Sequence, residues 1–443
     1  MQAIAQFFKF GERNTSLATE FRAGLTTFAV MAYIIFLNAS ILGAGLKLDP
    51  IAVAAATALV AGVMTIAMGL ASNYPFALAA GLGINAIVAF TLPAKGLTAA
   101  GAMGVIVIEG VIITILVVVG AREAIMNAVP LSQKRAIGVG IGLFILFIGF
   151  VNGGLITTPA GGVPIVGIRF PTTVGQAVFL FGLLVTIVLF VLKVRAALII
   201  SIVVTTILAL VTGVSTVPRD LTVTPNFSTL GAFNLTDVFT QLGVMSALLT
   251  IFAIMLSDFF DTMGTVTGIA AEAGLARADG SVPGIGRVLI VDSVAAIAGG
   301  AAGISSNTTF IESAAGVADG GRTGFASVVT GVLFLLAIFL SPLAAIIPFQ
   351  ATAPALVVVG YLMFTLVKDI NVADVEEGLP ALLTMILMPL TYDITVGIGA
   401  GFIAWVVIKV VKGKAASVHW LMYLVSLAFA VYFASDWIQG LVK

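Results

Sequence analysis

The chain has 443 residues, of which 60% are hydrophobic and only 9% are Asp, Glu, Lys or Arg, with a mean hydropathy of +1.21. A soluble domain carries about 25% charged residues, so this composition excludes an ordinary water-facing surface. The net charge of zero excludes the basic field that nucleic-acid binding needs. There are no cysteines, and the single histidine, His419, cannot form a His-based metal or haem site. The composition therefore predicts a polytopic helical membrane protein that needs no metal ion or other cofactor.

Apolar runs long enough to cross, or nearly cross, about 30 Å of hydrocarbon follow one another along the chain. They are 22–44, 51–70, 76–93, 98–119, 134–151, 174–192 and 195–213, then 242–264, 287–301, 304–318, 324–347, 353–368, 379–411 and 418–435. A polar connector at 214–241 separates the two sets. The run at 379–411 is too long for one span and is expected to break near Pro389 and Asp393. The sequence thus predicts an all-α protein with fourteen transmembrane segments, seven in each half.

Lysines and arginines predict the orientation of these runs, because both residues are enriched in cytoplasmic loops. With the N-terminus in the cytoplasm, twelve fall inside and four outside. The inner residues are Lys9, Arg13, Arg22, Arg122, Lys134, Arg135, Lys193, Arg195, Arg277, Arg287, Arg322 and Lys368; the outer ones are Lys47, Lys95, Arg169 and Arg219. By the same count Lys409, Lys412 and Lys414 fall outside and do not fit. The bias predicts a multi-pass protein of the cell membrane with a cytoplasmic N-terminus.

The two halves resemble each other in sequence. The segment LTTFAVM at 25–31 recurs 224 residues later as LTIFAIM at 249–255. Gly81 and Asn85 recur 222 residues later as Gly303 and Asn307. These near-equal offsets indicate a duplication, with 1–213 as the first repeat and 242–443 as the second. An odd number of spans in each repeat makes the copies run in opposite directions, as in secondary transporters.

Glycines interrupt the third and tenth runs at matching places. They are Gly81 and Gly83 in the third run, and Gly299, Gly300 and Gly303 in the tenth. A helix is expected to begin near Asn85 in the third run and at the N-capping cluster 305–308 in the tenth. Broken backbone at membrane depth occurs where protein or a cavity satisfies its hydrogen bonds, so matched breaks predict a binding site near the midplane. The glycines of the fifth run, Gly138, Gly140 and Gly142, predict close helix packing instead.

Carboxylates lie inside the predicted spans, whereas no Lys or Arg lies deep in any of them. They are Glu109, Asp258, Asp261, Asp292, Glu312 and Asp393. A central carboxylate costs about 2.5–3.5 kcal/mol, so we expect Asp261 and Glu312 to be functional and titratable, and Asp292 to be structural. Glu312 is expected about one turn inside the tenth-run helix. Two acids with neighbouring aromatic rings suit a neutral, planar, N–H-rich solute carried with a cation, whereas an anion would need Arg or Lys.

Three motifs resemble a known family. They are EFRAGLTTF at 20–28, followed by Met31, Tyr33 and Asn38; FFDTMGT at 259–265; and TFIESAAG at 309–316, continuing to GGRTG at 320–324. The sequence resembles the adenine/guanine/hypoxanthine permeases, a branch of the nucleobase:cation symporter-2 (xanthine/uracil permease) family. The resemblance runs from about Phe10 to the last spans.

This resemblance implies the fourteen-span fold of the uracil permease, with half-helices in spans 3 and 10. Spans 1–4 and 8–11 (about 22–120 and 242–347) would form a core domain, and spans 5–7 and 12–14 (about 121–213 and 348–443) a gate domain. Members of this fold dimerise through the gate and move the core in an elevator-like way.

The resemblance also implies the site residues. Asp261 and Glu312 match the pair that hydrogen-bonds the nucleobase, and either of them is expected to carry the coupled proton. The remaining candidates for substrate binding are Phe260, Thr265, Phe310, Ile311, Ser313 and Asn85. Phe260 is included because an aromatic ring beside the acids can stack on a flat ligand. Thr265 stands where relatives often carry a polar or titratable residue, which leaves the coupling residue open.

These observations predict a secondary transporter, not an enzyme, that imports adenine, guanine or hypoxanthine by proton symport. Sodium coupling stays open as an alternative. A second alternative is an anion transporter or exchanger of the same fold, against which the missing mid-span cations argue. A channel would show a ring of repeated pore residues, and an intramembrane enzyme a Ser/His pair or a His-based metal motif; neither pattern is visible.

Overall fold

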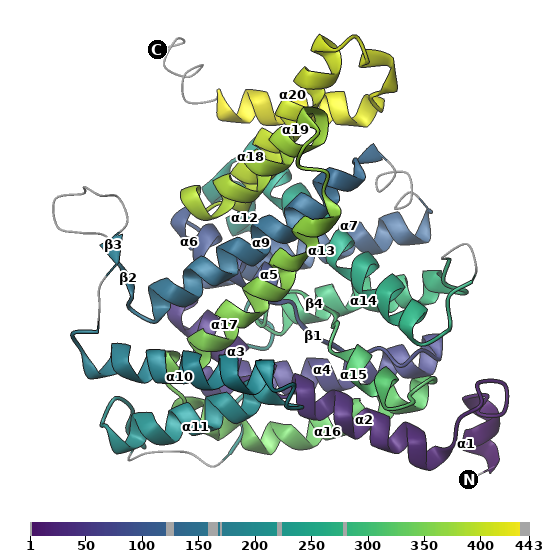
Figure 1. Cartoon of the computed structure of the whole chain (residues 1–443), viewed down its shortest axis with the longest axis vertical. Helices are drawn as coiled ribbons and strands as arrows, with labels where there is room; N and C mark the ends of the chain where they lie inside the picture. The colour runs from purple at the N-terminus through teal and green to yellow at the C-terminus, as the bar shows by residue number, and fades with distance from the viewer. Residues whose placement is uncertain are drawn as a thin grey trace.

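The computed structural model describes residues 2–120, 128–157, 167–168, 171–218, 224–277 and 281–434. Helices run mainly along one direction, and two short paired strands lie near the centre of the molecule (Figure 1). Three of the basic residues used for the orientation, Arg122, Arg169 and Arg219, lie outside the described residues.

The first half contains α1 (Gln2–Phe7), α2 (Leu17–Met31), α3 (Tyr33–Leu46), α4 (Pro50–Ser72), β1 (Leu78–Ala80), α5 (Leu82–Ala86), the π-helix η1 (Ile87–Thr91), α6 (Leu92–Ala94), α7 (Ala99–Val118), α9 (Leu131–Asn152), β2 (Ile156–Thr157), β3 (Gly167–Ile168), α10 (Val174–Val191) and α11 (Ala197–Val211). The second half contains α12 (Leu235–Leu242), α13 (Val244–Glu272), α14 (Ile285–Ala301), β4 (Asn307–Thr309), α15 (Ser313–Ala318), α16 (Gly324–Ala337), η2 (Ile338–Ala345), α17 (Phe349–Phe364), η3 (Thr365–Asp369), α18 (Val375–Thr391), α19 (Ile394–Val411), η4 (Ala415–Ser417) and α20 (Trp420–Phe433).

The lengths of these helices fit a bilayer. Nine helices within the described residues are long and apolar enough to span a membrane, and three shorter apolar helices accompany them. Short polar side chains fix where the spans begin: Asp49 caps α4, Thr98 caps α7 and Thr323 caps α16, each accepting a backbone N–H of the first turn. The all-α membrane class is confirmed, whereas the count of fourteen segments stays a prediction.

The long run at 379–411 is two helices rather than one span. Tyr392 adopts a left-handed conformation with φ of 58° and ends α18, and the Asp393 side chain then caps α19 through the N–H of Thr395. The expected break near Asp393 is confirmed, whereas Pro389 lies inside α18. After this hairpin α20 follows as a further apolar helix.

The hairpin corrects the placement of three lysines. Lys409 and Lys414 each donate to Glu376, in the first turn of α18, at 2.5 Å, and Lys412 lies 3.1 Å from the same carboxylate. The last turn of α19 therefore lies beside the first turn of α18. The count that put these lysines outside is wrong because it treated two antiparallel helices as one crossing. At this charged end the three lysines hold the pKa of Glu376 down, at about 2.

The helices pack in two groups. In the first, α4 packs against α16 and α3, α14 packs against α7, and α2 contacts α16 and α15. In the second, α9 packs against α17 and α18, and α17 also contacts α10 and α11. Helices α5 and α13 also belong to the first group, through contacts with α3 and α7. The two groups meet where α5 and α13 contact α9 and where α3 contacts α17. A boundary between two bodies of helices therefore runs through the middle of the chain's fold.

Glycines let the helices of the second group approach closely. A Cβ at Gly142 of α9 would lie 2.6 Å from Met363 Cβ on α17, and one at Gly140 would lie 2.5 Å from Met388 Sδ on α18. Both distances are shorter than real Cβ contacts. At Gly142 the Gly360 carbonyl oxygen also lies 2.9 Å away and backbone atoms would have to move, whereas at Gly140 the Met388 side chain would have to shift. The predicted packing role of these two glycines is confirmed.

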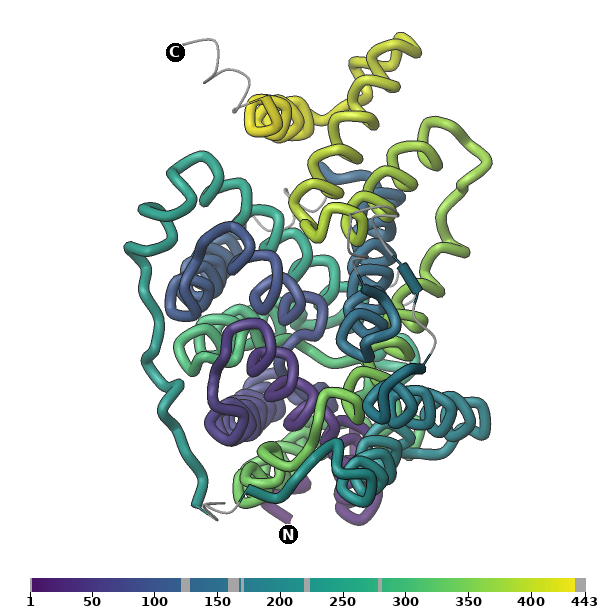
Figure 2. The backbone as a smooth tube through the Cα atoms, turned by 90° about the vertical axis from the view of Figure 1, so that its left-hand side faces the viewer, coloured from purple at the N-terminus to yellow at the C-terminus, as the bar shows by residue number. Residues whose placement is uncertain are grey.

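Residues 224–234 of the connector run along the outside of the helices, where Figure 2 shows them as a trace at the left-hand side. Within its described part, Asn226 donates to Asp49 before α4 at 2.7 Å, the Gly231 N–H donates to Ala301 O at the end of α14, and the Asn234 N–H donates to Ala100 O at the start of α7. These bonds place the first residues of α4 and α7 and the last residues of α14 at the same end.

Candidate binding site at the crossing of two broken segments

The centre of the fold is a pair of antiparallel strands from the two repeats. Leu78 of β1 faces Thr309 of β4, and Ala80 faces Asn307. The bonds Gly81 N–H to Ser306 O and Phe310 N–H to Ala77 O, both 2.9 Å, continue the pairing at its two ends. Two broken segments therefore cross at the middle of the molecule, and each satisfies the open backbone of the other.

The strand pairing corrects two expectations for the tenth segment. The cluster 305–308 does not cap a helix, because Asn307 and Thr308 belong to β4. Asn307 is therefore not the structural counterpart of Asn85, which lies inside α5, and the apparent 222-residue offset joined unlike positions. The physical reason is that strand formation depends on context. These polar residues form a buried strand because β1 of the same chain supplies the backbone hydrogen bonds.

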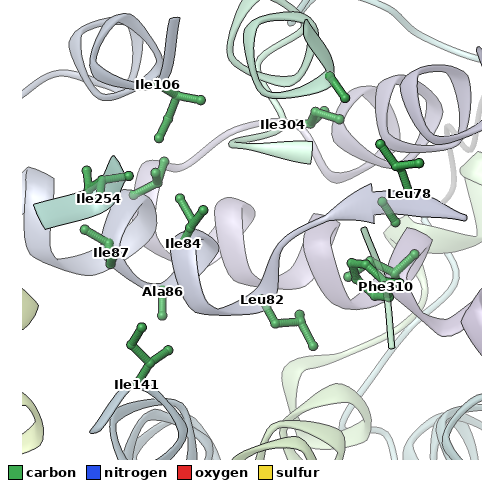
Figure 3. Packing of buried hydrophobic residues seen from close by; sticks show 14 of the residues in the cluster. Leu78, Leu82, Ile84, Ala86, Ile87, Ile106, Ile141, Ile254, Ile304 and Phe310 are labelled. Atoms are coloured by element: carbon green, nitrogen blue, oxygen red, sulfur yellow. The ribbon is translucent and has the colours of Figure 1, made fainter. Parts of the chain in front are cut away.

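A half-helix follows each strand. In the third segment α5 begins at Leu82, directly after Gly81 and three residues before the expected start, and continues through η1 and α6 to Ala94. In the tenth segment α15 begins at Ser313, and Glu312 is its N-cap residue rather than lying one turn inside. In Figure 3 β1 leads directly into α5, with Leu82 near the junction and Phe310 beside the strands.

Each strand is anchored by the long helix that precedes it. The Asp292 side chain on α14 accepts from the Thr309 N–H and hydroxyl at 2.9 Å and from the Thr262 hydroxyl at 2.7 Å. The Thr65 hydroxyl on α4 accepts from the Leu78 N–H at 2.9 Å and donates to Leu78 O at 3.1 Å. The expected structural character of Asp292 is confirmed, since its carboxylate holds β4 in place.

A pocket opens where the half-helices begin. Its lining residues come from five elements and the short links between them: Tyr33, Gly81, Leu82, Gly83, Asp261, Thr265, Thr309, Phe310, Ile311, Glu312, Val359 and Met363. Asp261 is exposed, Glu312 is partly exposed and Ile311 is 52% exposed. None of the lining residues is a lysine or an arginine. The pocket therefore offers two carboxylates and an aromatic ring without a compensating cation.

The structure brings together five of the eight predicted site residues. Asp261 and Thr265 from α13, and Phe310, Ile311 and Glu312 in the link between β4 and α15, all line the pocket.

The other three predicted site residues lie outside the lining. Ser313 accepts the Ala77 N–H through its hydroxyl at 2.9 Å, and Phe260 lies under the Lys134 ammonium at 5.5 Å. Asn85 donates to the Asn38 side chain at 2.9 Å.

Asn85 belongs to a buried amide network behind the pocket. Asn38, which receives its bond, donates in turn to the Thr57 hydroxyl at 2.9 Å and to Ile304 O at 3.2 Å. Asn85 and Asn38 are both fully buried. The network links α5, α3, α4 and the turn before β4, so it holds the two broken segments at a fixed separation.

Tyr33 is the main residue that the sequence analysis did not assign to the site. Its hydroxyl donates to Glu312 Oε1 at 2.6 Å, and its side chain is fully buried at the pocket wall. A hydrogen bond to a carboxylate is shorter and stronger than one between neutral groups, so Tyr33 fixes the position of the acid. Its place in the first motif was the available signal, but nothing in the sequence indicated that α3 reaches the tenth segment.

The second helix group also contributes to the pocket. Val359 and Met363 of α17 line it opposite the half-helices. Such a contribution could not be read from the sequence, because Val and Met in an apolar helix are indistinguishable from packing residues. No cluster of three or more His, Asp or Glu residues suited to a metal ion occurs in the part of the chain that the structure describes.

The fold and the pocket define a polytopic membrane transporter with an inverted repeat and two broken segments. The chain belongs to the permease family whose sequence model matches residues 18–400. It is 39% identical over 441 residues to the guanine/hypoxanthine permease PbuG of Bacillus subtilis, covering 96% of this chain and 98% of that one. It is 37% identical over 435 residues to the adenine permease AdeQ of Escherichia coli, covering 97% and 95%.

Solved structures share the fold at low sequence identity. The transmembrane domain of the cyanobacterial bicarbonate transporter BicA superposes with a TM-score of 0.65 at 15% identity, over 87% of this chain and 97% of that one. SLC26A9 superposes with a TM-score of 0.64 at 12% identity, over 90% of this chain and 66% of that one. These likenesses confirm the expected architecture.

Proposed function

We propose that this chain imports the purine nucleobases adenine, guanine or hypoxanthine by proton symport. The observation that carries the proposal is the pocket, where Asp261, Glu312 and the ring of Phe310 gather without a lysine or arginine. Carboxylates accept the N–H groups of a purine, and an aromatic ring packs on its plane. Relatives matched over nearly their whole length are named guanine/hypoxanthine and adenine permeases, which supports the same class of substrate.

In this proposal Asp261 and Glu312 bind the base and one of them carries the coupled proton. Thr265 and Ile311 complete the contact surface, and Phe260, Ser313 and Asn85 support it from behind. One proton moving down a potential of about 100 mV supplies roughly 2.3 kcal/mol, which corresponds to about fiftyfold accumulation. That gain is useful to a cell that collects dilute purines.

The two helix groups are proposed to be the core and gate domains, at about 22–120 with 242–347 and about 121–213 with 348–443. The pocket lies at their boundary, because α13 and the residues just before α15 line one side and Val359 and Met363 of α17 the other. Elevator-like movement of the core against the gate would carry the bound base from one side of the membrane to the other. We further propose that two copies associate through the gate, since α10 and α11 present exposed apolar residues such as Leu184 and Ile207.

The proposed location is the cell membrane with a cytoplasmic N-terminus. Lys409, Lys412 and Lys414 now lie beside Glu376, and Arg135 donates to Asp369 O just before it. With the corrected hairpin these lysines join the inner set, so the positive charge supports this orientation more strongly than the sequence count did.

The test is uptake of radiolabelled adenine, guanine and hypoxanthine by cells that express the chain and lack their own purine uptake. We expect saturable uptake that an uncoupler abolishes and that replacement of sodium leaves unchanged. Glu312→Ala and Asp261→Asn should lower uptake at least about tenfold, since each removes a hydrogen bond involving a charged group. The matched control is Glu272→Gln, an exposed acid at the end of α13, which should transport normally.

Each alternative gives a different result in this assay. Uptake that depends on sodium and survives the uncoupler would replace proton coupling with sodium coupling. Competition by sulfate or bicarbonate but not by purines would favour an anion transporter. Near-normal purine uptake by Glu312→Ala, with the variant inserted at normal levels, would reject the proposed site.

A further inference from the structure

An ion pair joins the end of the third segment to the second helix group. Lys95 directly follows α6, and its ammonium lies 2.9 Å from Asp393 in the turn between α18 and α19. Both side chains are only 14% exposed. The neighbouring Thr91 hydroxyl donates to Tyr392 O at 3.0 Å, so two contacts tie the end of this half-helix to the same turn. We call this contact the Lys95 pair.

A second ion pair joins the end of the tenth segment to the same helix group. Asp319 directly follows α15, and Arg195, in the turn between α10 and α11, donates to it at 2.7 Å. Asp319 also accepts from the Thr26 hydroxyl, and Arg22 donates to its backbone carbonyl at 3.0 Å. Asp319 is 10% exposed, whereas Arg195 is 70% exposed. We call this contact the Arg195 pair.

The two pairs are related by the inverted repeat. In each, the residue after a half-helix binds the turn between two consecutive helices of the opposite repeat, and the signs of the charges are exchanged. The antiparallel strands send α6 and α15 in opposite directions, and Figure 1 shows these helices on opposite sides of the central strands. The pairs therefore connect the two helix groups at the two opposite ends of the molecule.

We propose that Lys95, Asp393, Arg195 and Asp319 are positioning residues that hold the two half-helices at a fixed level relative to α17. This inference rests on the proposed function, in which the core moves against the gate. Because each pair joins a residue of the core to a residue of the gate, movement of the core along the membrane normal in either direction lengthens both of them. The arrangement in which both ion pairs are formed is then a stable intermediate, which we call the stop, between the outward-open and inward-open states.

The strength of the pairs sets the size of the expected effect. Ion pairs near a surface typically change an equilibrium by up to about fivefold, and the less exposed Lys95 pair should act more strongly than the Arg195 pair. Such a shift changes how often the pocket opens to each side without altering the pocket itself. The variants should therefore raise opening of the pocket to both sides and change the transport rate, while equilibrium binding of the base is retained.

The absence of cysteine from the sequence makes a direct test possible. A single cysteine replaces Met363 on the α17 side of the pocket, and the protein is placed in vesicles without purine. A membrane-impermeant maleimide is added from either side. The labelling ratio, measured for each side, is the labelling rate of a variant divided by the rate of the same cysteine-bearing chain without the further substitution. Lys95→Gln, Asp393→Asn and their combination are compared on this background. Asp393→Asn keeps the side-chain oxygen that caps α19, so a loss of the cap is not confused with a loss of charge.

We expect Lys95→Gln and Asp393→Asn each to change the labelling ratio by about two- to fivefold, and the double variant to change it no further. The control is Lys47→Gln, an exposed lysine at the same end, which should leave the ratio unchanged. For the other pair, Arg195→Gln should change the ratio and Arg195→Lys should restore it.

Additive effects of Lys95→Gln and Asp393→Asn, or an equal effect of Lys47→Gln, would overturn the proposal. The labelling assay contains no purine, so its result does not depend on which substrate the protein transports. If the unsubstituted chain transported no nucleobase, the proposed function would fail while the labelling ratios would still report on the ion pairs.

Discussion

The third and tenth segments share one architecture but differ in the chemistry they bring to the pocket. Both consist of a short buried strand followed by a half-helix, and the strands pair with each other. The third segment contributes Gly81, Leu82 and Gly83, whereas the tenth contributes Phe310, Ile311 and Glu312. The duplicated fold thus supplies a symmetric scaffold, and one copy alone carries the acid.

The side chains that anchor the two strands also differ in their chemistry, and the acidic one again belongs with the tenth segment. A carboxylate, Asp292, holds β4, and a hydroxyl, Thr65, holds β1. The segment that bears Glu312, a proposed binding residue, is therefore fixed by the stronger hydrogen-bond acceptor. We infer that the tenth segment has to be held more firmly, since its N-cap residue is itself the proposed binding group.

Substitution of the two anchors should give the largest difference between the segments. Asp292→Ala removes three hydrogen bonds to a buried charged group and should lower the free energy of unfolding by about 3 kcal/mol or more. Thr65→Val removes bonds of a neutral hydroxyl and should cost about 1 kcal/mol. Thermal unfolding in detergent measures both. Equal losses would show that the carboxylate adds nothing beyond what a hydroxyl provides.

Steric substitution at a glycine beside each strand should give a smaller difference; Gly299 lies in α14 against the turn before β4, and Gly81 directly follows β1. A Cβ at Gly299 would overlap the backbone oxygen of Ser305, which cannot move without disturbing the turn before β4. A Cβ at Gly81 would lie 2.7 Å from Thr308 Cγ2, which belongs to a side chain that can adjust. Gly299→Ala should therefore cost about 2 kcal/mol and Gly81→Ala about half as much, by the same unfolding measurement. A greater loss for Gly81→Ala would mean that the third segment is the more rigid one.

Acidification should produce the smallest effect, at the end of the tenth segment. The Thr26 hydroxyl, and then the Arg195 and Arg22 guanidinium groups, hold the pKa of Asp319 below its ordinary value. A carboxyl group whose pKa is lower in the folded state stabilises the fold at any pH above its ordinary, unfolded-state pKa. That contribution is lost only as the pH falls through the lower, folded-state pKa. Between about pH 7 and pH 5 the Arg195 pair should stay intact, because both values lie below this range.

The pH expectation is checked with the cysteine at position 363. The change in labelling ratio caused by Arg195→Gln should be the same at both pH values. If that change disappears at the lower pH, Asp319 titrates in the physiological range and the proposed stop is pH-dependent.

Several features could be predicted from sequence because they depend on composition and local pattern. The apolar runs identified the membrane class, the matched glycine breaks identified the two special segments, and acids without partner cations marked Asp261 and Glu312. The motifs around these acids identified the family. The excess length of the run at 379–411 also indicated a break near Asp393, which the structure confirms.

Other features required contacts between distant residues. A polar run such as 305–308 is compatible with a helix cap or a strand, and only the presence of β1 decides for the strand. The bond from Tyr33 to Glu312 joins residues 279 positions apart, and the contacts of Lys409 and Lys414 with Glu376 depend on the antiparallel packing of α18 and α19.

The sequence by itself determined that the protein resides in a lipid bilayer, which family it belongs to and which acids are candidates for substrate binding. Burial cost and local backbone preference are properties of single residues and short segments, so a sequence can reveal them. Only the tertiary structure decided which residues surround those acids, which ends share a side of the molecule and which charges tie the two helix groups together. Each of these depends on long-range packing, where many helix arrangements bury equal apolar area and specific polar contacts select one of them.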